Sequence, residues 1–150
     1  MAQNLNQFQQ TAERGQIALL TANSPVISAV VDSTETGTLK AGDAVKLVST
    51  SKGIPHVVKV GNSDTSFHGF VVFNPVKNEG IVAGDSVEIA ITGAFMYMTA
   101  SAAIYAGVAV DYAYATGKVA TANSGLECGV ALDAAAADGD LIRVAVKAAI

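Results

Sequence analysis

Two histidines, one cysteine and scattered carboxylates are the residues of this chain that could do chemistry. Cys128 would need a nearby base to act as a nucleophile, and only His56 and His68 could supply one. Neither histidine stands at a metal-ligand spacing, and no serine lies in a nucleophile-elbow sequence. We therefore expect no catalytic residue, no cofactor and no metal ion. Both histidines are interpreted as surface or satisfied core side chains, and Cys128 as a small core residue.

The acidic residues fall mostly in segments that read as turns. These are Asp32, Glu35, Asp43, Asp64, Asp85, Asp133, Asp138 and Asp140. Carboxylates in such places usually cap the backbone and keep the surface soluble. A glycosidase would need two of them facing each other across a cleft, which the sequence leaves open. The lack of tryptophan argues against sugar binding.

The chain is poor in charge. Charged residues make up 15% and hydrophobic residues 51% of the 150 positions, whereas soluble domains average about 25% charged residues. Such a chain either crosses a membrane or covers its surface with protein partners. Residues 89–110 carry no charge and are long enough to span a bilayer, but they contain Thr, Ser and Gly, no Leu, and no basic flanks. We expect buried strands there, and no membrane.

Nucleic-acid binding is also unexpected. The net charge is −4, and the nine basic residues form no cluster that could replace phosphate counterions. The first ten residues lack the basic start and apolar run of a secretory signal, so we expect none.

Short runs rich in β-branched and aromatic residues recur from residue 26 onward, separated by turn residues. They are residues 26–31, 45–48, 56–60, 69–73, 86–91, 94–98, 109–114, 118–120, 128–132 and 140–146. Val87, Ile89 and Ile91 alternate with smaller or polar residues, which is typical of a strand with one buried face. We predict an all-β fold, a compact β-barrel or sandwich of short antiparallel strands. Helix is expected only as single turns at residues 99–104 and 134–137.

The N-terminal segment differs from the rest. Residues 3–16 hold five Gln and two Asn, too few apolar groups to fold alone. We predict an extended arm over residues 1–23 and a β-rich domain over residues 24–150. The arm is either a frayed terminus or a partner-binding segment. In the second case the candidate contacts are Leu5, Phe8, Ile17, Leu19 and Leu20.

One turn phrase recurs along the chain. Leu-Lys-Ala-Gly-Asp-Ala-Val at residues 39–45 returns at residues 81–87, again at 104–110, and more loosely at 137–142. Gly adopts positive φ at little cost, and Asp bonds to nearby backbone N–H groups, so each copy predicts a turn that leads into a strand. The predicted turn residues are Gly42, Asp43, Gly84, Asp85, Gly107, Gly139 and Asp140.

The turn phrases also belong to a longer repeat. The order of turns and strands over about residues 39–91 recurs over about residues 104–146, with Gly53 matching Gly117 and residues 70–73 matching 130–133. We infer an internal duplication in which two similar halves pack around one core. Convergent use of a common turn phrase is the alternative.

The longer phrases resemble those of phage capsid cement proteins. The resemblance rests on residues 83–90, Gly93, 96–100, 106–110, 116–119, 129–133 and 137–146. It covers about residues 26–150. The first half departs from the plainer pattern in its longer, more polar loops at residues 49–59 and 61–67, and the arm has no counterpart.

This resemblance implies a structural protein and not an enzyme. It implies a place in the virion, on the outer capsid surface after synthesis in the host cytoplasm. There it would bind the major capsid protein and bridge neighbouring subunits, often as a homo-oligomer, here a homotrimer or homodimer. The alternatives are another virion module of the tail or fibre, and a small ligand-binding β-barrel.

Overall fold

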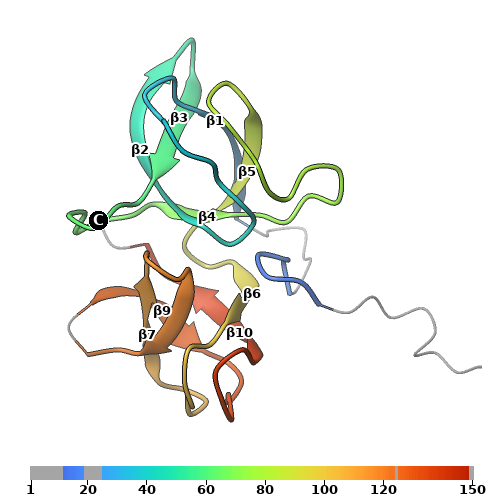
Figure 1. Ribbon diagram of the computed structural model, residues 1–150, viewed down its shortest axis with the longest axis vertical. Coiled ribbons are helices and arrows are strands. Elements are labelled where there is room, and N and C mark those ends of the chain that lie inside the picture. The colour runs from blue at the N-terminus through green and yellow to red at the C-terminus, as the bar shows by residue number, and fades with distance from the viewer. Residues whose placement is uncertain (1–11, 19–24, 124, 149–150) are drawn as a thin grey trace, which may run out of the picture.

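The computed structural model describes residues 12–18, 25–123 and 125–148. These residues form ten strands and no helix, and so include no helix long and apolar enough to cross a membrane. The strands form two lobes stacked along the long axis of the molecule (Figure 1). The first lobe contains β1 (Val26–Val31), β2 (Ala44–Ser51), β3 (Ile54–Lys59), β4 (Gly69–Val71) and β5 (Ser86–Ala90). The second contains β6 (Phe95–Thr99), β7 (Ala109–Ala113), β8 (Lys118–Thr121), β9 (Leu126–Ala131) and β10 (Leu141–Val146). The all-β prediction is confirmed.

The first lobe is a closed five-stranded barrel with the order β1-β3-β2-β4-β5. Its neighbours are antiparallel except for β1 and β3, which run parallel with Val30 opposite His56. Closure pairs the backbone groups that an open sheet would leave at its edges. The predicted barrel is therefore present, with one parallel pair among the antiparallel ones.

The second lobe repeats this arrangement. Its order is β6-β10-β9-β7-β8, and a parallel bridge from Ala100 to Val119 joins its first and last strands as β1 joins β3. When β1 to β5 are matched with β6 to β10, every pairing in one lobe has a counterpart in the other. The register agrees as well, because Ala44 lies opposite Phe70 just as Ala109 lies opposite Val130. The two lobes share one topology.

The two predicted helical turns are wrong. Residues 99–104 and 134–137 run beside each other as loops, and Ile104 and Ala135 exchange backbone hydrogen bonds of 3.0 and 2.9 Å. Both of these side chains are buried. Segments this short gain more from such tertiary pairing than from an isolated helical turn.

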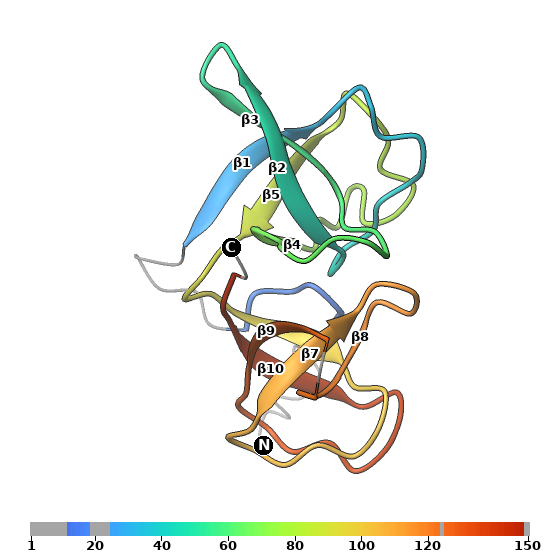
Figure 2. The ribbon, with the colours of Figure 1, turned by 90° about the vertical axis from the view of Figure 1, so that its left-hand side faces the viewer.

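The core has two parts. One fills the first barrel and includes Val31, Val45 and Ile89. The other fills the second lobe and continues onto the outer face of the first, where Phe70 is fully buried and its ring centroid lies 5.4 Å from that of Tyr112. The second core is therefore completed by residues of the first lobe, in place of one shared central core. Figure 2 shows β4 running between the two lobes.

Two glycines mark the places where strands approach most closely. Gly69 lies opposite Val45, and Gly129 occupies the same place in the second lobe. A Cβ added at Gly69 would lie 2.3 Å from the carbonyl oxygen of Ala90. A glycine in a strand often marks such a close backbone approach.

We expect Gly69→Ala to lower the free energy of unfolding by about 1–3 kcal/mol, because the backbone oxygen it meets cannot move aside. Gly61→Ala is the matched control, since its Cβ would meet only Asp64 Oδ2 at an ordinary 3.6 Å. Urea denaturation of both variants measures the difference. Equal stability of the two would contradict the close approach.

Candidate functional site

The recurring phrases form turns in front of strands. Asp43, Asp85 and Asp140 each accept a hydrogen bond from the backbone N–H three residues earlier, at 2.9, 2.9 and 3.1 Å. The glycine of every copy of the phrase has a positive φ. These glycines are Gly42 (+85°), Gly84 (+91°), Gly107 (+87°) and Gly139 (+94°). The third copy has Val108 where the others have Asp. The side chain of Asp43 stands apart, because it is 1% exposed while the others lie at the surface.

Asp43 belongs to a polar junction between the lobes that is centred on Arg14. The Arg14 guanidinium lies 3.3 Å from Asp43 Oδ1 and donates to the carbonyl oxygens of Ala41 and Gly42 in the first lobe. It also donates to Gly117 O in the second lobe, at 2.9 Å from Nη2. The Arg14 side chain is 18% exposed. The Arg14 side chain thus connects a turn of the first lobe to the β7–β8 turn of the second lobe.

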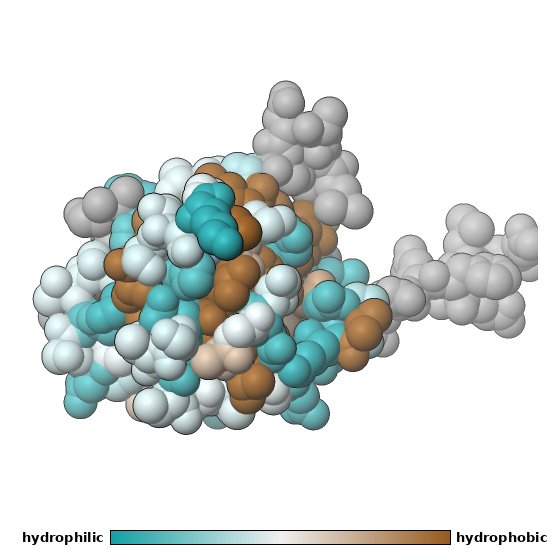
Figure 3. All heavy atoms as spheres, turned by 90° about the horizontal axis from the view of Figure 1, so that it is seen from above, coloured by the Kyte–Doolittle hydropathy of each residue, from teal (hydrophilic) through white to brown (hydrophobic). Residues whose placement is uncertain are grey.

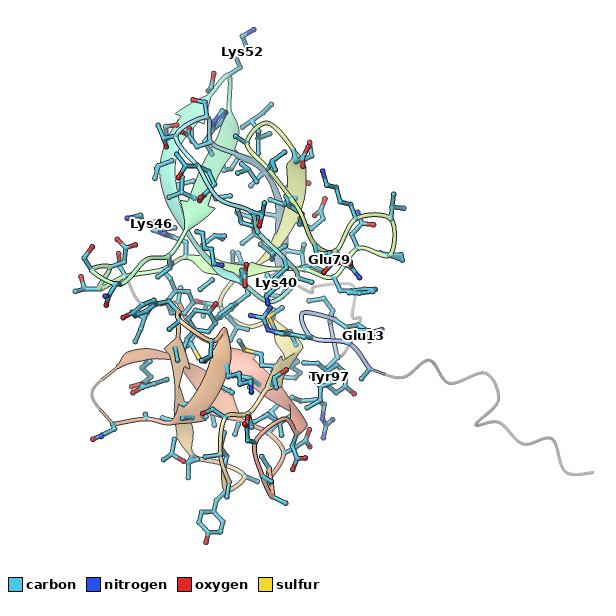
Figure 4. All side chains as sticks on the ribbon, viewed as in Figure 1. Glu13, Lys40, Lys46, Lys52, Glu79 and Tyr97 are labelled. Carbon is cyan, nitrogen blue, oxygen red and sulfur yellow. The ribbon has the colours of Figure 1, made fainter. Side chains whose placement is uncertain are left out.

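The segment that carries Arg14 extends the sheet of the second lobe. Ile17 forms an antiparallel bridge to Met96, and Tyr97 N donates to Gln16 O at 2.8 Å. Gly15 bonds to both lobes, since its N–H donates to Tyr97 O and its carbonyl accepts from Phe73 N. Figure 4 shows this segment beside the labelled Tyr97.

Sequence reasoning assigned residues 1–23 to an extended arm and did not single out Arg14. Residues 12–18 instead pack into the junction, and Ile17 lies partly buried against the core of the second lobe. The contacts of Arg14 reach residues far along the chain, so no local pattern marks them. Leu5, Phe8, Leu19 and Leu20 lie outside the described residues. Their binding to a partner, and that of Ile17, stays a prediction.

The two histidines and Cys128 make separate contacts. His56 Nδ1 lies 3.2 Å from Asp32 Oδ2, while His68 Nδ1 accepts a hydrogen bond from Leu47 N. Cys128 is fully buried, and burial raises the pKa of its thiol, which keeps it protonated and unreactive. Among the described residues, no group of His, Cys, Asp or Glu is arranged to hold a metal ion.

An open cleft of about 640 Å³ lies between the two lobes, lined in part by Asn62, Asp64, Asp111 and Tyr114. Its carboxylates are already engaged. Asp111 Oδ2 accepts two backbone N–H bonds, both of 2.8 Å, and Asp64 pairs with Lys46. The Lys46 hydrogen bond holds the pKa of Asp64 below its ordinary value, which favours the ionised carboxylate. The cleft offers no pair of free carboxylates for acid–base chemistry.

The surface instead presents large apolar side chains. Those exposed among the described residues are Ile27, Leu47, Val48, Ile54, Val76, Val82, Tyr105, Tyr114, Val130 and Leu132. Val76 is 92% and Tyr105 82% exposed. Figure 3 looks onto the end of the first lobe, where hydrophobic residues gather between polar ones. Contact with another protein is the chemistry that such side chains support.

Comparison with known protein families decides what kind of protein this is. Residues 28–147 match the family model described as phage cement protein. The chain belongs to the phage cement protein family. A comparison with curated proteins found no match. The resemblance seen in the sequence is confirmed, and the family gives the chain a structural role in a phage capsid, as a component of the virion that associates with capsid proteins. It is a family of structural proteins and not of enzymes.

For a cement protein the ion pairs at the surface bear on resistance to acid. Arg143 binds Asp133 through two hydrogen bonds of 2.7 and 2.8 Å. This pairing lowers the pKa of Asp133 to about 2. The hydrogen bond from Lys77, the larger cause, and the one from the backbone N–H of Val82 hold the pKa of Asp85 below its ordinary value.

We expect Arg14→Ala to lower the free energy of unfolding by about 3 kcal/mol, because it leaves Asp43 buried with one charge partner fewer and frees three carbonyl oxygens. Lys59 Nζ, 3.4 Å from Asp43, remains as the other partner. Arg143→Ala, which removes an exposed pair, serves as the control and should cost much less. Equal losses in denaturant titrations of the two variants would contradict the role of Arg14.

The lowered pKa of Asp133 makes the free energy of unfolding depend on pH. A carboxyl whose folded pKa is depressed stabilises the fold above its unfolded pKa, and that contribution is lost as pH falls through the folded value. The free energy of unfolding should therefore fall between pH 3.8 and about 2. Asp133→Asn should be less stable than the parent at neutral pH, and the difference should narrow across this window. A constant difference measured by chemical denaturation at each pH would refute the pairing.

Proposed function

We propose that the chain decorates the outer surface of a phage head and bridges neighbouring major capsid subunits. The family match over residues 28–147 is the observation that carries this proposal. Among the described residues, engaged carboxylates, separated histidines and a buried thiol agree with an adhesive role. The uncharged composition and the exposed apolar side chains supply surface for protein contacts.

A protein that bridges two capsid subunits must not bend between the two parts that bind them. The apolar packing of Phe70 on Tyr112 and the hydrogen bonds of the Arg14 guanidinium join the two lobes of this chain. A load applied to one lobe is therefore carried to the other through buried contacts. Outward pressure on a capsid is the load that this construction would resist.

The chain would add affinity by binding several subunits at once. Each contact can be modest, because the second binding event occurs at the effective concentration set by the first. Self-association into a homotrimer or homodimer would multiply the number of contacts. Leu5, Phe8, Leu19 and Leu20 are the proposed anchors of the arm on the shell, where an extended segment can add a strand to an exposed sheet edge. With its net charge of −4 the chain is proposed to bind neither nucleic acid nor membrane.

Co-sedimentation with purified capsid shells tests the proposal. The chain should pellet with expanded shells and saturate at a fixed ratio to the major capsid protein. Antibody raised against the chain should bind intact heads, since the proposed position is on the outside. A chain that stays in the supernatant at every shell concentration, or that antibody reaches only after the heads are opened, would overturn the proposal.

We expect the pair of changes Leu5→Ser and Phe8→Ser to weaken shell binding by about tenfold or more, because apolar anchors dominate most interfaces. The matched control is Gln7→Ser with Gln10→Ser, which alters the same segment without removing apolar groups. Both proteins should keep the parent's stability. Equal affinity of the two for expanded shells would remove the arm from the interface.

A further inference from the structure

The repeated topology makes it possible to compare each place in one lobe with its counterpart in the other. In the first lobe an outer wall formed by Ala44, Phe70 and Ala90 is completely buried, each residue being 0% exposed. This wall (Ala44, Phe70 and Ala90) covers one end of the sheet of the second lobe, because all three residues belong to the core of that lobe. Tyr112 at that end accepts a hydrogen bond from Ala44 N at 3.3 Å and stacks edge-on against Phe70.

The register identifies the counterpart of this wall in the second lobe. Ala109 lies opposite Val130, and Val130 lies opposite Ala145, as Ala44, Phe70 and Ala90 do in the first lobe. We call Ala109, Val130 and Ala145 the second wall. It is uncharged but uncovered: Val130 is 38% exposed, and both alanines are partly exposed. Leu132, next but one along the chain, is 37% exposed.

The covered end of the second lobe also has a counterpart in the first lobe. Tyr112 lies opposite Val119 as Leu47 lies opposite Val57, so Leu47 takes the place of Tyr112. Tyr112 is 4% exposed, whereas Leu47 is 42% exposed. By the same register Ile27, 37% exposed, takes the place of the fully buried Met96. We call Ile27 and Leu47 the open end of the first barrel.

Two further exposed apolar side chains lie on the hairpin that carries Leu47. Val48 and Ile54, on the β2–β3 hairpin that carries Leu47, are 44% and 46% exposed. Figure 3 looks along the long axis onto the first lobe and shows hydrophobic residues among polar ones. The chain therefore has an exposed second wall that covers nothing in the same chain. It also has an exposed open end that no wall of the same chain covers.

We infer that a second copy of this chain places the open end of its first barrel on the second wall of its neighbour. The contact would repeat between two chains the packing that already joins the two lobes within one chain. Wall and end are different surfaces, so the contact is heterologous, and it closes into a ring or continues as an array. The inference concerns self-association and does not depend on the proposed bridging of capsid subunits.

Sedimentation velocity tests this contact with the full-length chain. The wild type should sediment as an oligomer at its highest soluble concentration. Leu47→Asp and Val130→Asp should each reduce it to a monomer, because each places a charge in one of the two apolar surfaces. Val76→Asp is the control, since Val76 is 92% exposed and belongs to neither surface, and it should leave the oligomer intact.

An equal mixture of the two variants distinguishes this heterologous contact from a two-fold symmetric contact. Leu47→Asp keeps an intact second wall and Val130→Asp keeps an intact open end, so an equal mixture should form a dimer that neither forms alone. This result also shows that both variants are folded. A monomeric wild type, unchanged oligomers in both variants, or a mixture that stays monomeric would each overturn the inference. Shell co-sedimentation is scored separately, so loss of shell binding with an intact oligomer would count against the proposed function alone.

Discussion

The fold depends on one packing contact, in which the outer wall of the first barrel covers the end of the second lobe. Phe70 and Ala44 bury Tyr112, and without them the core of the second lobe would open to water. Burial of an aromatic pair of this kind contributes both apolar area and a favourable edge-on geometry. Arg14 adds a polar fastening at the rim of the same contact, where its guanidinium satisfies carbonyl oxygens of both lobes. The two lobes are consequently one mechanical body.

That construction suits a protein whose work is adhesion. In the part of the chain that the structure describes, backbone groups are paired by barrel closure and by residues 15–18 on the edge of β6. This pairing leaves fewer strand edges free, which limits uncontrolled association. Three of the exposed apolar side chains, those of Ile27, Leu47 and Val130, lie where the matching residue of the other lobe is buried.

Much of this fold could be predicted from local chemistry. Alternation in residues 86–91 and the Gly-Asp turns indicated the strands and their recurrence, because both signals depend on neighbouring residues alone. The predicted repeat begins at the turn phrases at residues 39 and 104. The shared topology begins one strand earlier, at β1 and β6, which no such phrase precedes. Leu47 and Tyr112 have the same place in their strands, so which one is covered is decided by packing between lobes. The role of Arg14 also depends on contacts between the lobes, so no local sequence pattern predicts it.

Cryo-electron microscopy of the intact phage head tests the account most directly, because it shows which surfaces of the chain are covered in the assembled particle. The account predicts density for both lobes on the outer surface over boundaries between major capsid subunits, with Ile27 and Leu47 of one copy against Val130 of the next. Density confined to the interior of the head, or isolated copies whose wall and open end both face solvent, would contradict it.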